Sequence, residues 1–270
     1  MIRRSSGSQT QLITQVDHAA FSGLLAARLG NDRFTVLAPG VIDAIAAHDA
    51  GWPLHDDQPT LNAQGQPLHV FETPPSLSTR IGSASVDRAA ILGPYAALLV
   101  SLHQLNLSDL VIHRSAALSP RDTFDLNKFQ HRQVELQEAF RKQLGLRTDI
   151  PLKLGLAAPG TNEAEDRLRC DFRWLVFCDA LSLELCCGKS VFPAIPSIHP
   201  APAAPPVQFE INRVNDETIV LKPWPFDAPA ISADIPFRSL SDQRFENDAA
   251  FQAALKNAPV ARLPVQLRSN

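Results

Sequence analysis

The feature that most constrains this chain is a change of pattern near residue 193. Before it, five segments repeat apolar residues at the spacing of one helix face. Six prolines then stand between residues 193 and 206, a density that keeps a chain extended and stiff. After them, short segments alternate apolar and polar side chains, as half-buried strands do. The pattern predicts a mainly α protein, a helical bundle followed by a small β-rich C-terminal subdomain.

The element boundaries follow from capping residues, glycines and prolines. The expected helices cover about residues 14–30, 41–49, 87–107, 122–146 and 163–187. Residues 1–13 are polar and are expected to be loose, whereas residues 53–85, rich in Pro, Gly, Asp and Gln, are expected to form a long ordered loop. After the prolines, strands are expected at 207–211, 218–221, 231–237 and 263–267, with a short helix at 249–257.

These elements divide the chain into three predicted parts. Residues 1–192 form the helical domain, residues 193–206 a proline-rich linker, and residues 207–270 the β-rich subdomain. Four short strands bury little core of their own, so this subdomain is expected to dock on the bundle.

Charge and composition exclude several classes of protein. Against 28 acidic residues stand 25 Lys and Arg, a net charge of −3 without a long basic run, which disfavours nucleic acids and anionic membranes as partners. The longest apolar stretch, 89–102, contains Gly93-Pro94 and is too short to span a bilayer. The basic N-terminus lacks the apolar stretch of a signal peptide, so a cytoplasmic protein is expected. Four cysteines lie within residues 170–187, too close for a disulfide framework, and are expected to be buried free thiols.

Ionisable residues on the apolar faces of separate predicted helices form a candidate site. His18 shares a face with Phe21, His48-Asp49 ends the second helix, and His103 and Asp179 stand within apolar runs. A carboxylate in surroundings as apolar as those of Asp179 needs a partner, because burying it alone costs several kcal/mol. Imidazole and carboxylate ligands suit Zn, Mn, Fe or Mg, and helical bundles direct such ligands inward. The pattern predicts a divalent metal ion.

The order of these residues also resembles a known superfamily. His18, the pair His48-Asp49 and the late Asp179 are similar to the metal ligands of HD-domain metal-dependent phosphohydrolases. More closely, the chain resembles the bacterial family catalogued as domain of unknown function 3891. The motifs that carry this resemblance are ITQVDHAAFSG (13–23), HDAGW (48–52), PYAALLVSLH (94–103), DALSL (179–183) and PWPF (223–226).

The HD resemblance implies a hydrolase that attacks a phosphoester with a metal-activated water. Asp49 would bind the metal and orient the water, and His103 would protonate the leaving group or act as a further ligand. Two-metal HD proteins add two histidines before the last Asp, and only His103 fits that role here, so one or two ions per chain are expected. The expected partner is a small-molecule substrate, which can be a phosphorylated one. A di-iron oxygenase of HD type and a non-catalytic metal- or ligand-binding protein are the alternatives.

Other interpretations of single residues stay open. Asp179 could pair with Arg173 or Lys189, Asp17 is more typical of an N-cap than of a ligand, and Ser182 is placed to bond within the site. The remaining histidines are most simply surface or loop residues: His55, His69, His113, His131 and His199. The segment 52–85 directly follows His48-Asp49, and it is expected to shape a pocket together with Trp224; the alternative for Trp224 is plain packing.

Overall fold

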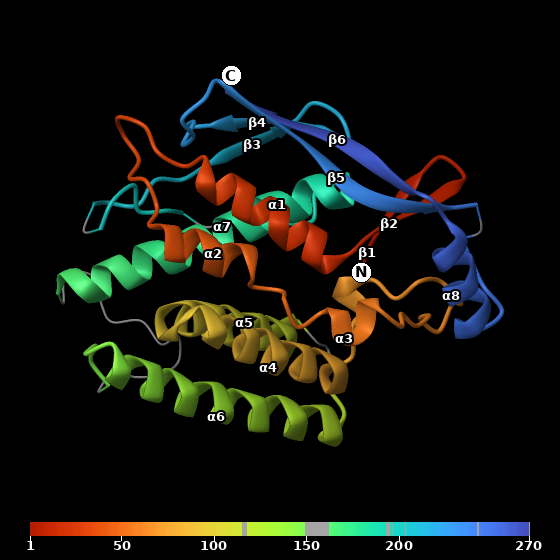
Figure 1. The fold of residues 1–270 in the computed structure, drawn as a ribbon, viewed down its shortest axis with the longest axis horizontal. Helices are drawn as coiled ribbons and strands as arrows, with labels where there is room; N and C mark the ends of the chain where they lie inside the picture. Colours follow the sequence, from red (N-terminus) through yellow and green to blue (C-terminus); the bar gives the residue numbers. More distant parts are fainter. Residues whose placement is uncertain are drawn as a thin grey trace.

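The computed structural model describes residues 1–114, 118–148, 162–192, 195, 197–202, 204–241 and 243–269. In these residues a six-stranded sheet lies on one side of the molecule and a stack of helices on the other (Figure 1). The helical elements are α1 (Gln15–Ala27), α2 (Pro39–Ala46), α3 (Pro53–Asp56), a 3-10 turn η1 (Val70–Glu72), α4 (Pro75–Leu92), α5 (Pro94–Arg114), α6 (Pro120–Gln143), α7 (Glu163–Cys187) and α8 (Asp248–Asn257).

The sheet draws its strands from both ends of the chain. The N-terminal hairpin supplies β1 (Ile2–Ser6) and β2 (Gln9–Ile13), and the C-terminal part supplies β3 (Glu210–Arg213), β4 (Thr218–Lys222), β5 (Ala230–Leu240) and β6 (Val260–Arg268). Their order is β1-β2-β5-β6-β4-β3. All neighbours are antiparallel except β4 and β6, which are parallel, so the sheet is mixed.

The sheet corrects the expected fold class. The chain is an α/β protein, because a mixed sheet of six strands covers one side of the helices; the predicted mainly α fold with a small β subdomain is wrong. Residues 1–13 misled the prediction because they carry charged and polar side chains. Arg4 is nevertheless buried: its guanidinium donates to the Leu185 and Asp216 carbonyl oxygens and pairs with Glu217 at 2.7 Å.

Most expected helices are confirmed, with one omission. The helix at 163–187 matches α7, and Gly188 ends it in the left-handed conformation at φ 64°. Gly93-Pro94 is a fresh start, since α4 ends before it and α5 begins at Pro94. The omission is the helical structure within the expected loop 53–85, which holds the short α3, η1 and the first half of α4. The largest part of it is the start of α4. Its sequence is rich in Ser and Thr and weakly apolar, although Pro75 stands at the first helical position, where proline is favoured.

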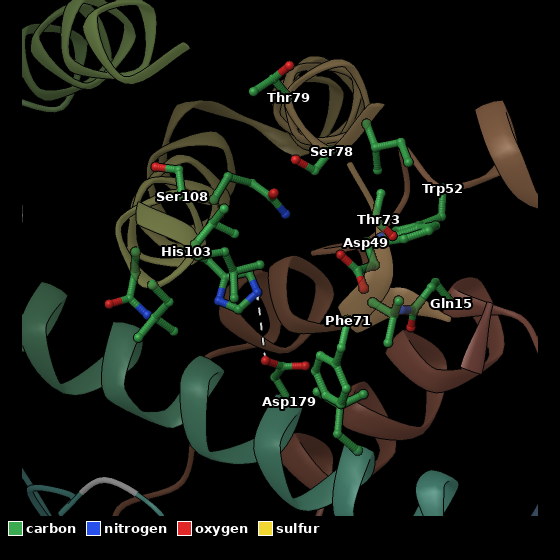
Figure 2. A pocket seen from close by; sticks show the side chains of 18 of the residues that line it. Gln15, Asp49, Trp52, Phe71, Thr73, Ser78, Thr79, His103, Ser108 and Asp179 are labelled. Atoms are coloured by element: carbon green, nitrogen blue, oxygen red, sulfur yellow. Dashed lines mark ion pairs between the residues drawn. The ribbon is translucent and has the colours of Figure 1, made fainter. Parts of the chain in front are cut away.

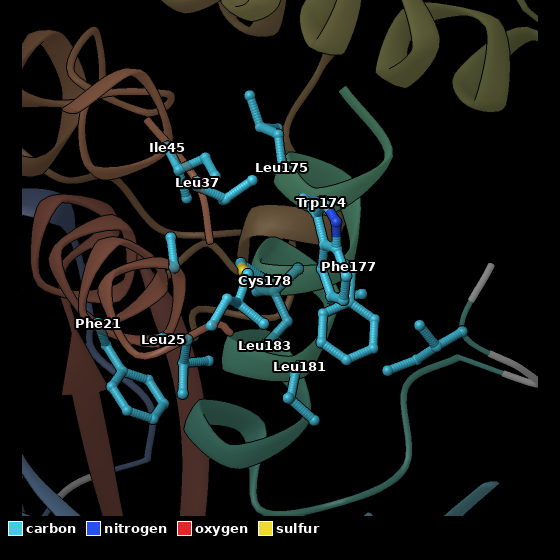
Figure 3. Packing of buried hydrophobic residues seen from close by; sticks show 14 of the residues in the cluster. Phe21, Leu25, Leu37, Ile45, Trp174, Leu175, Phe177, Cys178, Leu181 and Leu183 are labelled. Atoms are coloured by element: carbon cyan, nitrogen blue, oxygen red, sulfur yellow. The ribbon is translucent and has the colours of Figure 1, made fainter. Parts of the chain in front are cut away.

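The helices form layers beneath the sheet. In Figure 1, α1 and α7 lie next to the sheet, α4 and α5 lie below them, and α6 is outermost. The main core fills the space around α7. Leu175 and Cys178 lie on the side of this helix that faces Leu25 of α1 and Ile45 of α2 (Figure 3). On its other side Trp174 and Phe177 pack on Phe34 and Phe209. All four cysteines are free and buried, as expected.

Among the described residues, one helix is long and apolar enough to cross a membrane. It is α5, over Pro94–His113, and 61% of its apolar window is buried within the protein. An apolar helix covered by its neighbours is typical of the core of a soluble protein.

Candidate metal centre

The structure brings all five predicted site residues together at one point. His18 lies in the first turn of α1, His48 and Asp49 form the turn after α2, and His103 and Asp179 lie in the middle of α5 and α7. The His18, His48 and His103 side chains are almost inaccessible, and Asp49 and Asp179 are only 6% and 7% exposed. Four segments that are distant in sequence therefore supply one buried group of three imidazoles and two carboxylates.

Asp179 is the centre of the group. Its Oδ1 lies 2.9 Å from His18 Nε2 and 3.4 Å from His48 Nε2, and its Oδ2 lies 3.8 Å from His103 Nε2. Asp49 joins through Oδ2, which is 3.7 Å from His48 Nε2. The expected alternatives of Arg173 or Lys189 as partners of Asp179 are not seen among the described residues, where its charged partners are histidines.

Hydrogen bonds on the outer side of two rings fix their orientation. His48 Nδ1 lies 2.7 Å from the Ile45 carbonyl oxygen, to which it can only donate. His18 Nδ1 lies 2.7 Å from Ser182 Oγ, and the same hydroxyl donates to the His18 carbonyl at 3.0 Å. Since that hydroxyl proton is engaged, the ring nitrogen donates to Ser182. In both rings Nδ1 therefore carries a proton, and Nε2 is the nitrogen that faces the group.

Burial and mutual charge shift the pKa values of the group in the absence of an ion. Burial would lower the pKa of His48, but the nearby carboxylates of Asp49 and Asp179 raise it to about 9. Burial lowers the pKa of His103 to about 4 and raises that of Asp49, which His48 partly offsets. For Asp179 the hydrogen bond with His18 and the nearby rings of His48 and His103 outweigh burial and hold the pKa below its usual range.

The donor set fits a divalent cation. The triads His18–His48–Asp49 and His48–His103–Asp179 each place their ligand atoms within 4.8 Å of one another. Ligands about 2.1 Å from an ion stand roughly 3.0–3.4 Å apart in octahedral or tetrahedral coordination. The shorter observed separations, 2.9 and 3.4 Å, match this range. His48 Nε2 is buried and has no hydrogen-bond partner, which an ion would supply.

Close backbone approach holds the His48-Asp49 turn in place. A Cβ on Gly51 would lie 2.1 Å from the Ile81 carbonyl oxygen and 2.7 Å from Ser85 nitrogen, so α4 can approach only because this residue is glycine. The Gly51 amide donates to Ser85 Oγ at 2.9 Å. From α5, Gln104 Nε2 donates to the His48 carbonyl at 3.2 Å. The turn is thus tied to both helices.

The group opens into a cavity of about 780 Å³. Figure 2 shows Asp49, His103, Asp179 and Gln15 directed into the same space, with Phe71 and Trp52 beside them. Both polar atoms of Gln15 are buried and without a hydrogen-bond partner, one helical turn before His18. A cavity of this size, mostly apolar with a few convergent polar groups, is typical of a small-molecule site.

Of the two parts expected to shape the pocket, residues 52–85 line the cavity and Trp224 does not. Residues between Trp52 and Thr79 line the cavity, including the 3-10 turn η1. Trp224 does not: its ring packs on Phe226 at 4.9 Å and its indole nitrogen donates to the Ala228 carbonyl, so plain packing is its role.

The structure also shows the roles of the N-cap of α1, Ser182 and two further histidines. Thr14, rather than Asp17, is the N-cap of α1, and Asp17 accepts a hydrogen bond from its hydroxyl. Ser182 does bond within the site. His55 and His69 are buried, at 4% and 7% exposure, rather than surface residues. His69 caps η1, with Nδ1 accepting from the Phe71 amide, and this packing was not visible in the sequence.

Comparison with known proteins identifies the family of the chain. No curated protein and no solved structure matches it. A family model does match, over residues 1–242, a range that contains all five residues of the buried group. That match covers most of the 270 residues, so the chain belongs to the family described as protein of unknown function (DUF3891).

Proposed function

We propose that this protein is a metal-dependent hydrolase of HD type that acts on a phosphoester. The observation that carries the proposal is the convergence of His18, His48, Asp49 and Asp179 at the floor of a cavity, in the order that resembles HD-domain enzymes. Fe, Mn, Zn and Mg all suit these ligands. When bound, such an ion lowers the pKa of a water and offsets charge on the phosphoryl oxygens.

The chain's own residues divide the remaining work. Asp49 lines the cavity next to His48, so one carboxylate oxygen would bind the ion and the other is placed to orient a water. The low pKa of His103 keeps its ring neutral, which favours a ligand or hydrogen-bond donor over a general acid. Gln15 offers its unpaired amide to the substrate at the same end of the cavity.

The geometry of the site also bears on the two alternatives, a di-iron oxygenase and a non-catalytic metal-binding protein. Both ligand triads share His48, so the described residues offer one complete set of ligands rather than two, which favours a single ion over a di-iron centre. Purely structural ions are enclosed by their ligands, whereas this group borders an open cavity. We therefore favour a catalytic ion over a purely structural one. We also propose that the partner is a small-molecule substrate and that the protein is cytoplasmic.

Turnover by metal-reconstituted protein tests the proposal. Untagged protein would be stripped with a chelator, reloaded with Mn²⁺, Ni²⁺, Zn²⁺, Mg²⁺ or Fe²⁺, and offered p-nitrophenyl phosphate and bis(p-nitrophenyl) phosphate. We expect metal-dependent release of nitrophenol that His48→Gln and Asp49→Asn abolish. His131→Gln, an exposed histidine of α6, is the matched control. Two irons per chain with oxygen uptake would support the oxygenase, and bound metal without turnover of either ester would support a binding protein.

A further inference from the structure

The cavity extends well beyond the metal centre. Its lining includes residues of α5 on the C-terminal side of His103, residues of α7 on the N-terminal side of Asp179, and residues of α6. We call this part of the lining the arm; it is largely apolar and contains Leu107, Val111, Leu126, Phe129, Phe172 and Val176. The arm therefore suits an apolar body, since burial of apolar surface is its main source of binding free energy.

A single cationic side chain lies in this arm. Among the described residues that line the cavity, Arg173 is the one Arg or Lys, against the acids Asp49, Glu72 and Asp179. Glu72 is engaged by Arg3 at 2.8 Å, and the two aspartates belong to the metal centre. Arg173 itself is half-buried and, within the described part of the chain, has no ion pair. Burial and the neighbouring Arg169 lower its pKa, as expected for a cation short of an anion.

Arg173 is too far from the metal centre to share its ligand. Six residues separate it from Asp179 on α7, which is about 9 Å along a helix axis. Side chains of a helix lean towards its N-terminus, which carries the guanidinium further from the histidines. A phosphoryl group bound by an ion at the metal centre would therefore leave Arg173 unpaired, and a second negative group is needed to reach it.

We propose that the substrate is an elongated, largely apolar molecule whose second anionic group, a carboxylate or phosphate, is bound by Arg173. This inference rests on the proposed function for the position of the reacting ester, which would lie between Gln15 and His103. Nucleoside di- and triphosphates are disfavoured, because several adjacent negative charges need more cationic side chains than this arm provides.

Equilibrium binding of a simple apolar anion tests Arg173 without any turnover. Decanoate and the neutral 1-decanol would be titrated into the protein as purified, by calorimetry. We expect Arg173→Met to weaken decanoate binding by about 10–100-fold, the loss of a charge-assisted hydrogen bond, and to leave decanol unchanged. Arg173→Lys should restore part of the decanoate affinity, and Arg132→Met, on the exposed face of α6, should have no effect.

Each outcome decides one of the two proposals. Decanoate binding that is absent, or insensitive to Arg173→Met in a protein with unchanged thermal unfolding, overturns the anion site even if phosphoesters are hydrolysed. If Arg173→Met unfolds the protein, Arg173→Lys decides, since a point charge without the guanidinium fork should bind decanoate more weakly than wild type yet bind it. Arg173-dependent binding in a protein that hydrolyses no ester leaves the anion site standing and rejects the hydrolase.

Discussion

Replacing Ser182 with alanine separates a residue that positions a metal ligand from one that merely packs. The Ser182 hydroxyl accepts from His18 Nδ1 at 2.7 Å and donates to the His18 carbonyl at 3.0 Å. Ser22 Oγ also donates to the His18 carbonyl, at 3.2 Å, and is equally buried, but it does not touch the ring. Ser22→Ala is therefore a matched control for every effect except orientation of the imidazole.

The expected magnitudes follow from these contacts. In Ser182→Ala the Nδ1–H is left buried and unpaired, which costs about 1–3 kcal/mol of unfolding free energy. Loss of the partner that orients a metal-binding histidine weakens metal affinity by about 10–100-fold. For Ser22→Ala we expect a loss of about 1 kcal/mol or less, because the His18 carbonyl keeps its bond from Ser182, and an unchanged metal affinity.

Competition with a fluorescent zinc chelator measures the affinities, and urea unfolding measures the stabilities. A tenfold or larger increase in Kd for Ser182→Ala alone would agree with the arrangement described above. Equal increases for both variants, or none for either, would refute the argument that His18 is a ligand oriented through Nδ1.

Three further predictions rest on other contacts. Asp179→Asn should abolish metal binding and lower the unfolding free energy by about 3–5 kcal/mol, because it leaves buried histidines without their anion; unchanged metal content by mass spectrometry would make Asp179 structural. Gly51→Ala should lower stability by about 1–3 kcal/mol and also weaken metal binding, since its methyl group would collide with the Ile81 carbonyl; a wild-type melting temperature would contradict this. Burial and Arg3 lower the pKa of His69 from 6.5 to about 4. The neutral ring therefore contributes about 3 kcal/mol to the unfolding free energy above pH 6.5, and this stability is lost as pH falls through 4. His69→Asn, which keeps a capping acceptor, should flatten the pH dependence of the unfolding free energy over this window.

The helices and the site were predictable because both depend on local patterns. The apolar face and the terminal Gly188 of α7 are visible in the sequence, and the same face predicts that Asp179 is buried. Buried ionisable groups need partners, which made the histidines on other helices candidates for Asp179 beside Arg173 and Lys189. The order of His18, His48-Asp49 and Asp179, which resembles HD-domain enzymes, favoured the histidines. Ser182 could be found in the same way, one turn beyond Asp179.

The sheet and the far arm of the cavity were not predictable for physical reasons. The strands β1 and β2 contain Arg3, Arg4 and several polar residues. Long-range contacts stabilise them there, among them the pairing of β2 with β5 and the ion pair of Arg4 with Glu217. Strand propensity depends on such tertiary context. The position of Arg173 in the cavity depends on how α7 packs beside α5, and its sequence neighbours give no indication of it.

The metal content of untagged protein, measured by inductively coupled plasma mass spectrometry beside His48→Gln, tests the central claim most directly. We expect about one Fe, Mn, Zn or Mg ion per wild-type chain and close to none in the variant, as for a site with four protein ligands. Folded wild-type protein that neither contains nor takes up any of these ions, or a His48→Gln variant that retains the full complement, would contradict it.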